Sequence, residues 1–325
     1  MRAFITGATG FIGINLVRRL LDDGWQTTVL HRKGSQLKSL ERLDVEFVEG
    51  DLSDVDKLDQ ILSEGFDAVF HLAGDISLWK QNNRQQDEVN IEGTKNLARL
   101  SLKHDVGRFI HTSSIAVWGL QSGVISEQTE KLGATAPINY MRSKYFGEQE
   151  VLACVEEGLD AVILNPSNVM GPYDSRGWSR LFLLIKKGQL AGFTPGLGAF
   201  CHVKDVVDAH VMAFKHGKRG QNYLLGGPHC SYEDLITEIA QRVQAPAPKK
   251  IPFSLVMSVA YLSECISWLT GREPQITPEK ARLFAMDVKV DGRLAENHLQ
   301  YQSTPLKEIL DDSYEWLKAE SYFST

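Results

Sequence analysis

The sequence predicts an α/β fold built on a doubly wound parallel sheet, with a smaller, interleaved C-terminal substrate domain. Two observations predict it. In the first half of the chain, short apolar runs alternate with stretches of helical periodicity, and this alternation requires right-handed crossovers between parallel strands. After Pro166 the pattern loosens and glycine and proline recur, which indicates a second region with a different organisation.

The predicted strands are short runs rich in Val, Ile and Phe. Apolar residues occupy both faces of these runs, as expected for a sheet that helices cover on both sides. The runs span residues 2–6, 26–31, 45–50, 67–73, 107–114 and 160–166, and a returning strand spans 222–227. The predicted helices span residues 11–23, with Ile12, Leu16 and Leu20 on one stripe, 84–104, 139–157 and 204–216.

The order of these elements divides the chain into two interleaved domains. A dinucleotide-binding domain of the Rossmann type is expected to comprise residues 1–166 and 203–227. A substrate-binding region is expected to comprise residues 167–202 and 228–325. Within it, residues 244–252, "QAPAPKKIP", have the composition of a linker.

Composition argues against several classes of function. The net charge of −6 provides no basic excess for nucleic-acid binding. Four widely spaced cysteines form no CxxC pair, so we expect free thiols in a reducing compartment and a cytoplasmic location. The nine histidines form no ligand-spaced pair with a cysteine or carboxylate, so we expect no structural metal.

One later segment, Ile251 to Leu269, is almost long enough to span a membrane. It contains Glu264 and four serines, and Pro252 stands at its start. We therefore expect no membrane span here, but a buried or lid-forming helix, with contact to a membrane surface as the alternative.

A glycine-rich turn, "ITGATGFIG" (5–13), ends the first strand and opens the first helix. Gly7 allows a sharp turn, Gly10 allows close approach of a ligand, and Gly13 allows the helix to pack against the strand. The N–H groups at the start of the helix can bind a phosphate. The alternative is a tight turn without a ligand, but the position in the first turn of a βαβ unit favours dinucleotide binding.

The end of the second strand indicates which dinucleotide binds. An NAD-binding protein places an acidic residue there for the ribose 2′-hydroxyl. This chain has Arg32 and Lys33, followed by Lys38, and no acid before Glu41. Basic residues match a 2′-phosphate in charge and geometry, so NADP is favoured over NAD. The alternative is a solvated basic loop.

A third motif lies near the middle of the chain, in "YMRSK" (140–144). Tyr140 and Lys144 are four residues apart near the start of a predicted helix and therefore share a face. An ammonium group near a phenol lowers the phenol's pKa, and Ser114, from "HTSSIAVWG" (111–119), could hold a substrate oxygen beside them. Alone, this pair would be more typical of an exposed helix surface.

Together, and in this order, the three motifs resemble the extended short-chain dehydrogenase/reductases, also called the NAD-dependent epimerase/dehydratase family. The resemblance covers essentially the whole chain and implies that Ser114, Tyr140 and Lys144 are catalytic. It also implies a set of cofactor-binding residues: Gly7, Thr9, Gly10, Phe11, Ile12, Gly13, Arg32, Lys33, Asp51, Leu52, Leu72, Ala73, Gly74, Thr112, Lys144, Pro166 and Ser167.

Within the family, the chain resembles the dihydroflavonol-reductase-like group, through "DISLWK" (75–80), "NIEGTKNL" (90–97) and "SWLTGREPQIT" (267–277). It differs from nucleotide-sugar enzymes, which commonly place a diphosphate-binding arginine where Gly198 and Ala199 stand here. It differs from sugar dehydratases, which follow the catalytic hydroxyl with an Asp-Glu pair where this chain has Ile115 and Ala116.

The expected substrate pocket is therefore apolar. For each candidate wall residue, simple core packing is the alternative. The candidates are Trp79, Trp118, Met170, Trp178 and Phe200, with Met141 and Phe193 less prominent.

We therefore expect an NADP-dependent oxidoreductase that reduces an apolar aldehyde or ketone by hydride transfer, with Tyr140 as the general acid. The alternatives are a nucleotide-sugar epimerase and a non-catalytic NADP-binding sensor protein. The expected partner is a small-molecule carbonyl or alcohol. A homodimer through helices 84–104 and 139–157 is possible by the same resemblance.

Overall fold

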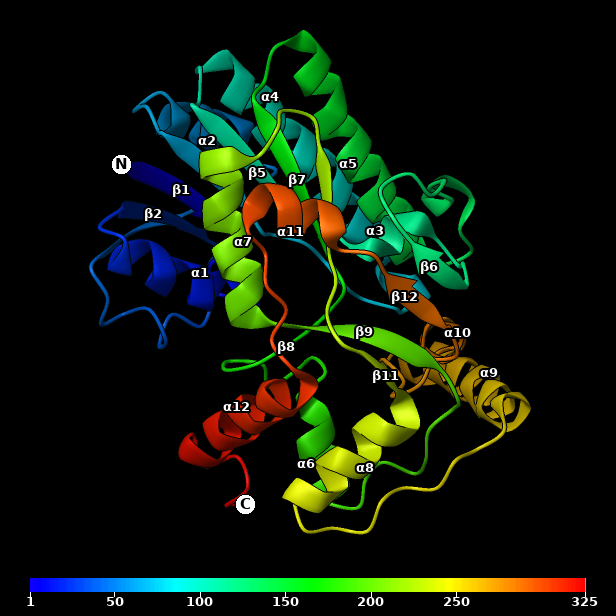
Figure 1. Cartoon of the computed structure of the whole chain (residues 1–325). Coiled ribbons are helices and arrows are strands. Elements are labelled where there is room, and N and C mark those ends of the chain that lie inside the picture. Colours follow the sequence, from blue (N-terminus) through cyan, green and yellow to red (C-terminus); the bar gives the residue numbers. More distant parts are fainter. Residues whose placement is uncertain (325) are drawn as a thin grey trace.

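In the computed structural model, which describes residues 1–324, a seven-stranded parallel sheet lies between two layers of helices (Figure 1). The strand order is β10-β7-β5-β4-β1-β2-β3, and every neighbouring pair is parallel. This confirms the predicted fold class. The strands are β1 (Arg2–Thr6), β2 (Gln26–His31), β3 (Val45–Glu49), β4 (Ala68–His71), β5 (Arg108–Thr112), β7 (Ala161–Pro166) and β10 (Asn222–Leu225).

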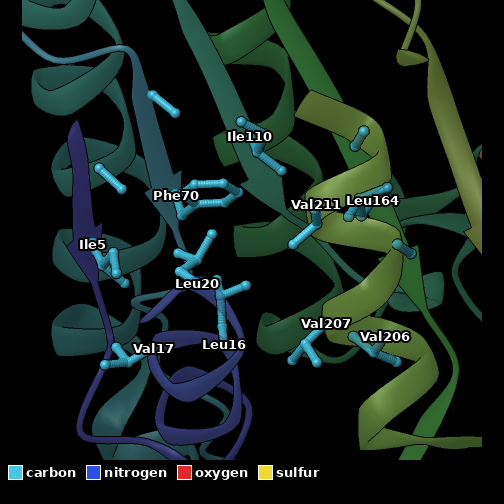
Figure 2. Close-up of a cluster of buried hydrophobic side chains, with 14 of the residues drawn as sticks. Ile5, Leu16, Val17, Leu20, Phe70, Ile110, Leu164, Val206, Val207 and Val211 are labelled. Carbon is cyan, nitrogen blue, oxygen red and sulfur yellow. The ribbon is translucent and has the colours of Figure 1, made fainter. Parts of the chain in front are cut away.

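Alternation along the strands explains the two helical layers, because successive side chains of a strand point to opposite faces of the sheet. On one face, Ile5, Phe70 and Ile110 pack against α1 (Phe11–Asp22) and α7 (Val203–His216), as Figure 2 shows. On the other face, the preceding residues of the same strands, Phe4, Val69 and Phe109, pack against three further helices. These are α2 (Val55–Leu62), α4 (Thr94–Lys103) and α5 (Asn139–Glu157).

The predicted helix 84–104 is present but irregular. It consists of α3 (Asn83–Asp87), a π-helical segment η2 (Glu88–Gly93) and α4. A π-helical turn inside a helix is rare and often lies at a functional site. Here η2 turns the Asn90 side chain toward the loop that follows β4, where its amide oxygen accepts from the Asp75 N–H at 2.7 Å.

The remaining elements form a smaller layer beside the large sheet. A three-stranded sheet has the order β11-β9-β8, and β6 pairs with β12. Helices α6, α8 and α12 share one apolar cluster with β8 and β9. Because α7 and β10 return to the large sheet after β9, the chain passes between the two parts more than once (Figure 1). The predicted boundaries of the dinucleotide-binding domain and the substrate-binding region stay a prediction. The elements are β6 (Gly123–Ile125), β8 (Asn168–Met170), β9 (Leu197–His202), β11 (His229–Ser231), β12 (Val288–Val290), α6 (Arg180–Lys186), α8 (Tyr232–Arg242), α11 (Arg293–Leu299) and α12 (Leu306–Ala319).

The segment that begins at Ile251 forms α9 (Phe253–Thr270), followed by α10 (Pro278–Leu283). The prediction of a buried helix is wrong, because only Ala260 and Ser267 of α9 are buried. Among residues 1–324, α9 is the one helix that is long and apolar enough to cross a membrane by length and composition.

A test of this packing is Gly147→Ala. A Cβ atom at Gly147 of α5 would lie 2.1 Å from the Asn90 carbonyl oxygen, so the added methyl group must push two backbones apart. Alanine favours a helix over glycine by about 1 kcal/mol, but overpacking against backbone outweighs this gain. We expect a net loss of about 1–3 kcal/mol in the free energy of unfolding, measured by denaturant titration.

The matched control for that titration is Glu156→Ala, on the exposed side of the same helix. We expect its unfolding free energy to stay within about 0.5 kcal/mol of the unmodified protein. Equal stability of the two variants would contradict the close packing of α5 on η2.

Candidate functional site

The carboxyl ends of the parallel strands meet at one edge of the large sheet, and the predicted site residues follow these ends. The strand order reverses between β1 and β4, because the chain continues from β1 to β2 on one side and to β4 on the other. In open α/β sheets, ligands bind in the crevice outside such a switch point.

The β1–α1 turn lies in this crevice. Gly7 has a φ of +72°, and a Cβ atom there would lie 2.5 Å from the Leu72 carbonyl carbon and the Ala73 nitrogen. A Cβ atom at Gly13 would lie 2.3 Å from the Gly7 oxygen. Both positions therefore require glycine. Helix α1 starts behind the turn without a side-chain cap, so its first N–H groups are available to an anion. This geometry fits the pyrophosphate of a dinucleotide.

The other predicted cofactor residues surround the same edge. Arg32 and Lys33 are exposed just beyond β2. Asp51, beyond β3, is also exposed and accepts hydrogen bonds from the Ser53 N–H and hydroxyl at 3.0 and 2.8 Å. The remaining predicted cofactor residues lie at the same edge. Thr9 and Gly10 are in the β1–α1 turn, and Phe11 and Ile12 are in the first turn of α1. The buried Leu52 follows β3, Leu72, Ala73 and Gly74 follow β4, and Pro166 and Ser167 lie at the end of β7.

The three predicted catalytic residues come together at the end of β5. Ser114 follows that strand by two residues, and its hydroxyl accepts from the Ala116 N–H at 3.1 Å. Tyr140 lies beside Ser114, near enough for the Ser114 side chain to lower the pKa of the phenol. The Lys144 ammonium, one turn along α5, donates to the Thr112 carbonyl oxygen at 2.8 Å. A chain of polar groups thus runs along the end of β5.

Burial sets the protonation of this group. It lowers the pKa of Lys144 to about 8, against the opposing effect of the nearby Glu148 carboxylate. Burial raises the pKa of Tyr140, and the Ser114 side chain only partly offsets that effect. The expected lowering of the phenol's pKa is therefore wrong for the protein alone, since desolvation dominates. Tyr140 is held protonated at neutral pH.

A buried carboxylate that was not predicted from the sequence supports the three predicted catalytic residues. Glu148 is fully buried, forms an ion pair with Lys131, and accepts from the Asn165 amide at 3.0 Å. The same amide donates to the Ser114 carbonyl oxygen at 3.2 Å. Glu148 therefore connects the helix that carries Lys144 to the backbone that carries Ser114. Two signals were present in the sequence: Glu148 stands four residues after Lys144, and Asn165 interrupts an apolar strand.

Two stacked histidines lie buried below this edge of the sheet. His71 is bonded to the Thr6 and Thr94 hydroxyls at 2.7 and 2.9 Å, and its ring lies 5.3 Å from that of His111. Burial and the nearby Lys144 ammonium lower the pKa of His71 to about 3 and place that of His111 well below its usual value. Both rings are therefore neutral packing elements at physiological pH, and neither serves as a proton donor.

An open pocket of about 440 Å³ has none of the three predicted catalytic residues in its lining, but it adjoins an apolar cluster that contains Tyr140. Leu120 and Met286 line it, and both also pack in the apolar cluster that contains Tyr140 and Met141. The rest of its lining consists of Gln121, Ser122, Pro195, Phe253, Arg282 and Ala285. None of these residues was identified in the sequence, because they come from four separate segments.

The predicted wall residues lie elsewhere. Trp118, Met170 and Phe200 are at most 1% exposed and belong to core clusters. Trp178 stacks on Tyr232 with 5.6 Å between ring centroids. For these residues the structure shows core packing, and a substrate role stays a prediction.

Trp79 contacts the α9–α10 segment, which supplies part of the pocket lining. It is half-buried, and its indole N–H donates to the Ser267 hydroxyl of α9 at 3.1 Å. The neighbouring Leu78 packs in the cluster around Tyr140, and its carbonyl accepts from Thr277 at 2.8 Å. The loop after β4 thus joins the α9–α10 segment to the catalytic region.

This is the geometry of a nicotinamide-dependent enzyme of the short-chain type, and comparison with known proteins agrees. The profile of the NAD dependent epimerase/dehydratase family matches residues 3–226. The chain is 30% identical to a putative dihydroflavonol 4-reductase from Synechocystis sp., over 99% of this chain and 96% of the relative. It is 29% identical to sterol demethylase protein B from Methylococcus capsulatus, over 98% of each.

Solved structures show the same fold. A crystal structure of gox2253 is 31% identical, covers 98% of both chains and gives a TM-score of 0.83. UDP-glucose 4-epimerase from Thermotoga maritima gives a TM-score of 0.81 at 21% identity, with 98% of this chain and 99% of that chain covered, and at that identity the likeness concerns the fold alone.

The chain belongs to the NAD-dependent epimerase/dehydratase family, that is, to the extended short-chain dehydrogenase/reductases. This confirms the predicted resemblance, including the dihydroflavonol-reductase-like group. Membership supports an NAD(P)-dependent oxidoreductase, epimerase or dehydratase activity.

A test of the buried network is Glu148→Gln. The carboxylate raises the pKa of Lys144, so its loss should move that pKa further below about 8. The ammonium would then be lost at lower pH than in the unmodified protein. The measurement is an NMR titration of lysines labelled with carbon-13 at Cε, with Lys144→Met to assign the signal.

Glu150→Gln, on the same helix and near Lys95 at the surface, is the control. It should leave the Lys144 titration unchanged. An unchanged titration in Glu148→Gln as well would show that the buried carboxylate does not act on the ammonium.

Proposed function

We propose that this protein is an NADP-dependent oxidoreductase that reduces an aldehyde or ketone on an apolar molecule. The observation that carries the proposal is the group at the end of β5, where Tyr140 lies beside Ser114 and the Lys144 ammonium, one turn along α5, donates to the Thr112 carbonyl oxygen. Hydride for the carbonyl carbon is the contribution of the nicotinamide when NADPH is bound.

The chain's own residues handle the carbonyl oxygen. Ser114 orients the oxygen by hydrogen bonding, and Tyr140 donates a proton to it as negative charge develops. Because burial raises the pKa of Tyr140, the hydroxyl holds its proton at neutral pH, as a general acid must. Lys144 supplies positive charge beside the developing phenolate and is fixed in place by the Thr112 carbonyl.

The preference for NADP follows from the end of β2. Arg32 and Lys33 are exposed there, where an acidic residue would bind the ribose hydroxyls of NAD. Two cations at this position suit a 2′-phosphate, because each can form a charge-assisted hydrogen bond with it. The glycine turn and the uncapped α1 accommodate the pyrophosphate in either cofactor.

The pocket indicates an apolar substrate. Its lining combines Leu120, Phe253, Ala285 and Met286 with one cation, Arg282. A nucleotide diphosphate needs several convergent cations, and strand β9 offers Gly198 and Ala199, both buried, where nucleotide-sugar enzymes commonly place an arginine. We therefore favour carbonyl reduction over sugar epimerisation. A homodimer and a cytoplasmic location stay predictions.

Replacement of the proposed acid tests the assignment. We expect Tyr140→Phe to fold, to bind NADPH as before, and to lose activity by a factor of about 10²–10⁴, since that is the usual contribution of a positioned acid. The measurement is NADPH oxidation with a panel of apolar aldehydes and ketones. Tyr145→Phe, on the same helix, is the control and should retain activity.

Two results would contradict the proposal. Near-normal turnover by Tyr140→Phe would remove that residue from the chemistry. No turnover of any carbonyl by protein that binds NADPH would favour the epimerase or the non-catalytic sensor.

A second test concerns the cofactor. We expect the double variant Arg32→Ser/Lys33→Ser to bind NADPH about tenfold or more weakly, since it loses charge-assisted hydrogen bonds to the 2′-phosphate, and to bind NADH as before. Fluorescence titration with both cofactors measures this. Arg42→Ser, on the same loop, is the control. An unchanged ratio of the two affinities would mean that the basic residues are only a solvated loop.

A further inference from the structure

Helix α9 presents a large apolar surface to the outside of the molecule. Eight of the protein's exposed large apolar residues lie on its 18 positions, and only 11% of the helix is buried. Leu262, Trp268 and Leu269 are 63%, 75% and 89% exposed. The others are Phe253, Leu255, Val259, Tyr261 and Ile266. Contiguous exposed apolar surface of this kind marks a contact site.

The opposite side of α9 is anchored to the protein by polar contacts. Ser267 is buried and accepts from the Trp79 indole. Glu264, the helix's single charged residue, is turned inward to Lys80 at 3.2 Å, with its side chain 13% exposed. At the edge of the exposed surface, the Tyr261 hydroxyl accepts from Arg282 of α10 at 3.2 Å. Ala260, Glu264 and Ser267 therefore form the inward side of the helix, and the exposed apolar residues, with Ser254, Ser258 and Cys265 among them, cover the outward side.

The stretch of sequence that contains α9 has a net charge opposite in sign to that of the whole protein, although one of its cations, Lys250, is paired with Glu233 outside the stretch. Residues 249–282 contain five Lys and Arg residues and three Glu residues, a net charge of +2, in a chain with a net charge of −6. Two of the three acids, Glu264 and Glu279, are turned inward and paired with Lys80. Lys249 and Arg272 are exposed at the two ends of the helix.

We propose that α9 docks the protein on the surface of an anionic phospholipid bilayer. The aliphatic and aromatic side chains enter the boundary between headgroups and acyl chains, while Lys249 and Arg272 reach the phosphates at the two ends. Each cation near an anionic surface contributes about 1 kcal/mol. The helix does not cross the bilayer, since this would bury the polar anchors of Ser267 and Glu264 in hydrocarbon.

A second copy of the chain is the competing occupant. Leu255, Val259, Leu262, Ile266 and Leu269 do follow the 4-3 spacing of a coiled-coil seam. Specific coiled coils place charges beside that seam to fix partner and register, whereas here the flanking positions carry residues such as Ser258 and Cys265. Tyr261 and Trp268 widen the apolar surface beyond a two-residue seam. A broad surface with cations at its ends favours lipid.

The first experiment is co-sedimentation of the full-length protein with vesicles of phosphatidylcholine, with and without phosphatidylglycerol. The test variant is Leu262→Ser/Trp268→Ser/Leu269→Ser, and the control is Ile76→Ser/Val124→Ser, which removes apolar side chains of comparable exposure elsewhere. We expect the unmodified protein and the control to bind the anionic vesicles, and the test variant to bind about tenfold or more weakly. Thermal unfolding verifies that each variant is folded.

A second variant, Lys249→Gln/Arg272→Gln, keeps the apolar surface. We expect about fivefold weaker binding for each cation removed, on anionic vesicles only. Equal vesicle binding by the test variant and the unmodified protein would overturn the proposal. The proposal would also be overturned if the unmodified protein does not bind vesicles but forms a dimer, measured by light scattering, and the test variant does not form that dimer. These assays need no catalysis, so their outcome is separate from that of the proposed function.

Discussion

The hydrogen bond from Lys144 to the Thr112 carbonyl fixes the position of helix α5 over the end of strand β5. A buried ammonium needs such a partner, because desolvation alone would neutralise or expel it. The bond places Tyr140 one turn earlier, beside Ser114, which follows Thr112 by two residues. One turn later, Glu148 connects the same helix to the backbone of Ser114 through Asn165. The relative positions of these side chains therefore depend on helix α5 being fixed relative to the end of strand β5.

Protonation follows from this arrangement. Burial favours the neutral form of four ionisable groups close to the end of β5. His71 and His111 become neutral and simply fill space. Tyr140 keeps its proton. Lys144 differs, because the Glu148 carboxylate opposes the effect of burial and the pKa of Lys144 falls only to about 8. The site thus contains one phenol that can give a proton and one cation that can stabilise the resulting charge.

Much of this could be predicted from the sequence, for identifiable reasons. The seven strands of the large sheet were predicted to within two residues at each end and helix α5 to the residue, because buried strands and helices repeat their apolar residues at different periods. The strands of the smaller sheets were not predicted. Gly7 and Gly13 were predicted because backbone packing at those places leaves no room for a Cβ atom. The juxtaposition of Ser114 with Tyr140 followed from family resemblance and not from periodicity.

The parts that could not be predicted depend on long-range packing. Nothing local shows that Glu148 is fully buried, since its partner Lys131 comes from a distant loop. An apolar residue type predicts burial but not the cavity it faces, which is why Trp118 and Phe200 turned out to be core residues. The same ambiguity explains α9, whose composition fits a buried helix as well as an exposed one.

The pocket has a consequence for how this scaffold can change its substrate. Its lining comes from the segment after β5, from Pro195, and from the α9–α10 segment, whereas Tyr140 and Lys144 stand on α5. If this pocket holds the substrate and Tyr140 is the acid, as proposed, shape selection and proton chemistry reside on separate parts of the chain. Exchange of residues 253–286 with those of a relative would then change the specificity and leave the proposed acid in place, which makes this segment a natural unit for enzyme engineering.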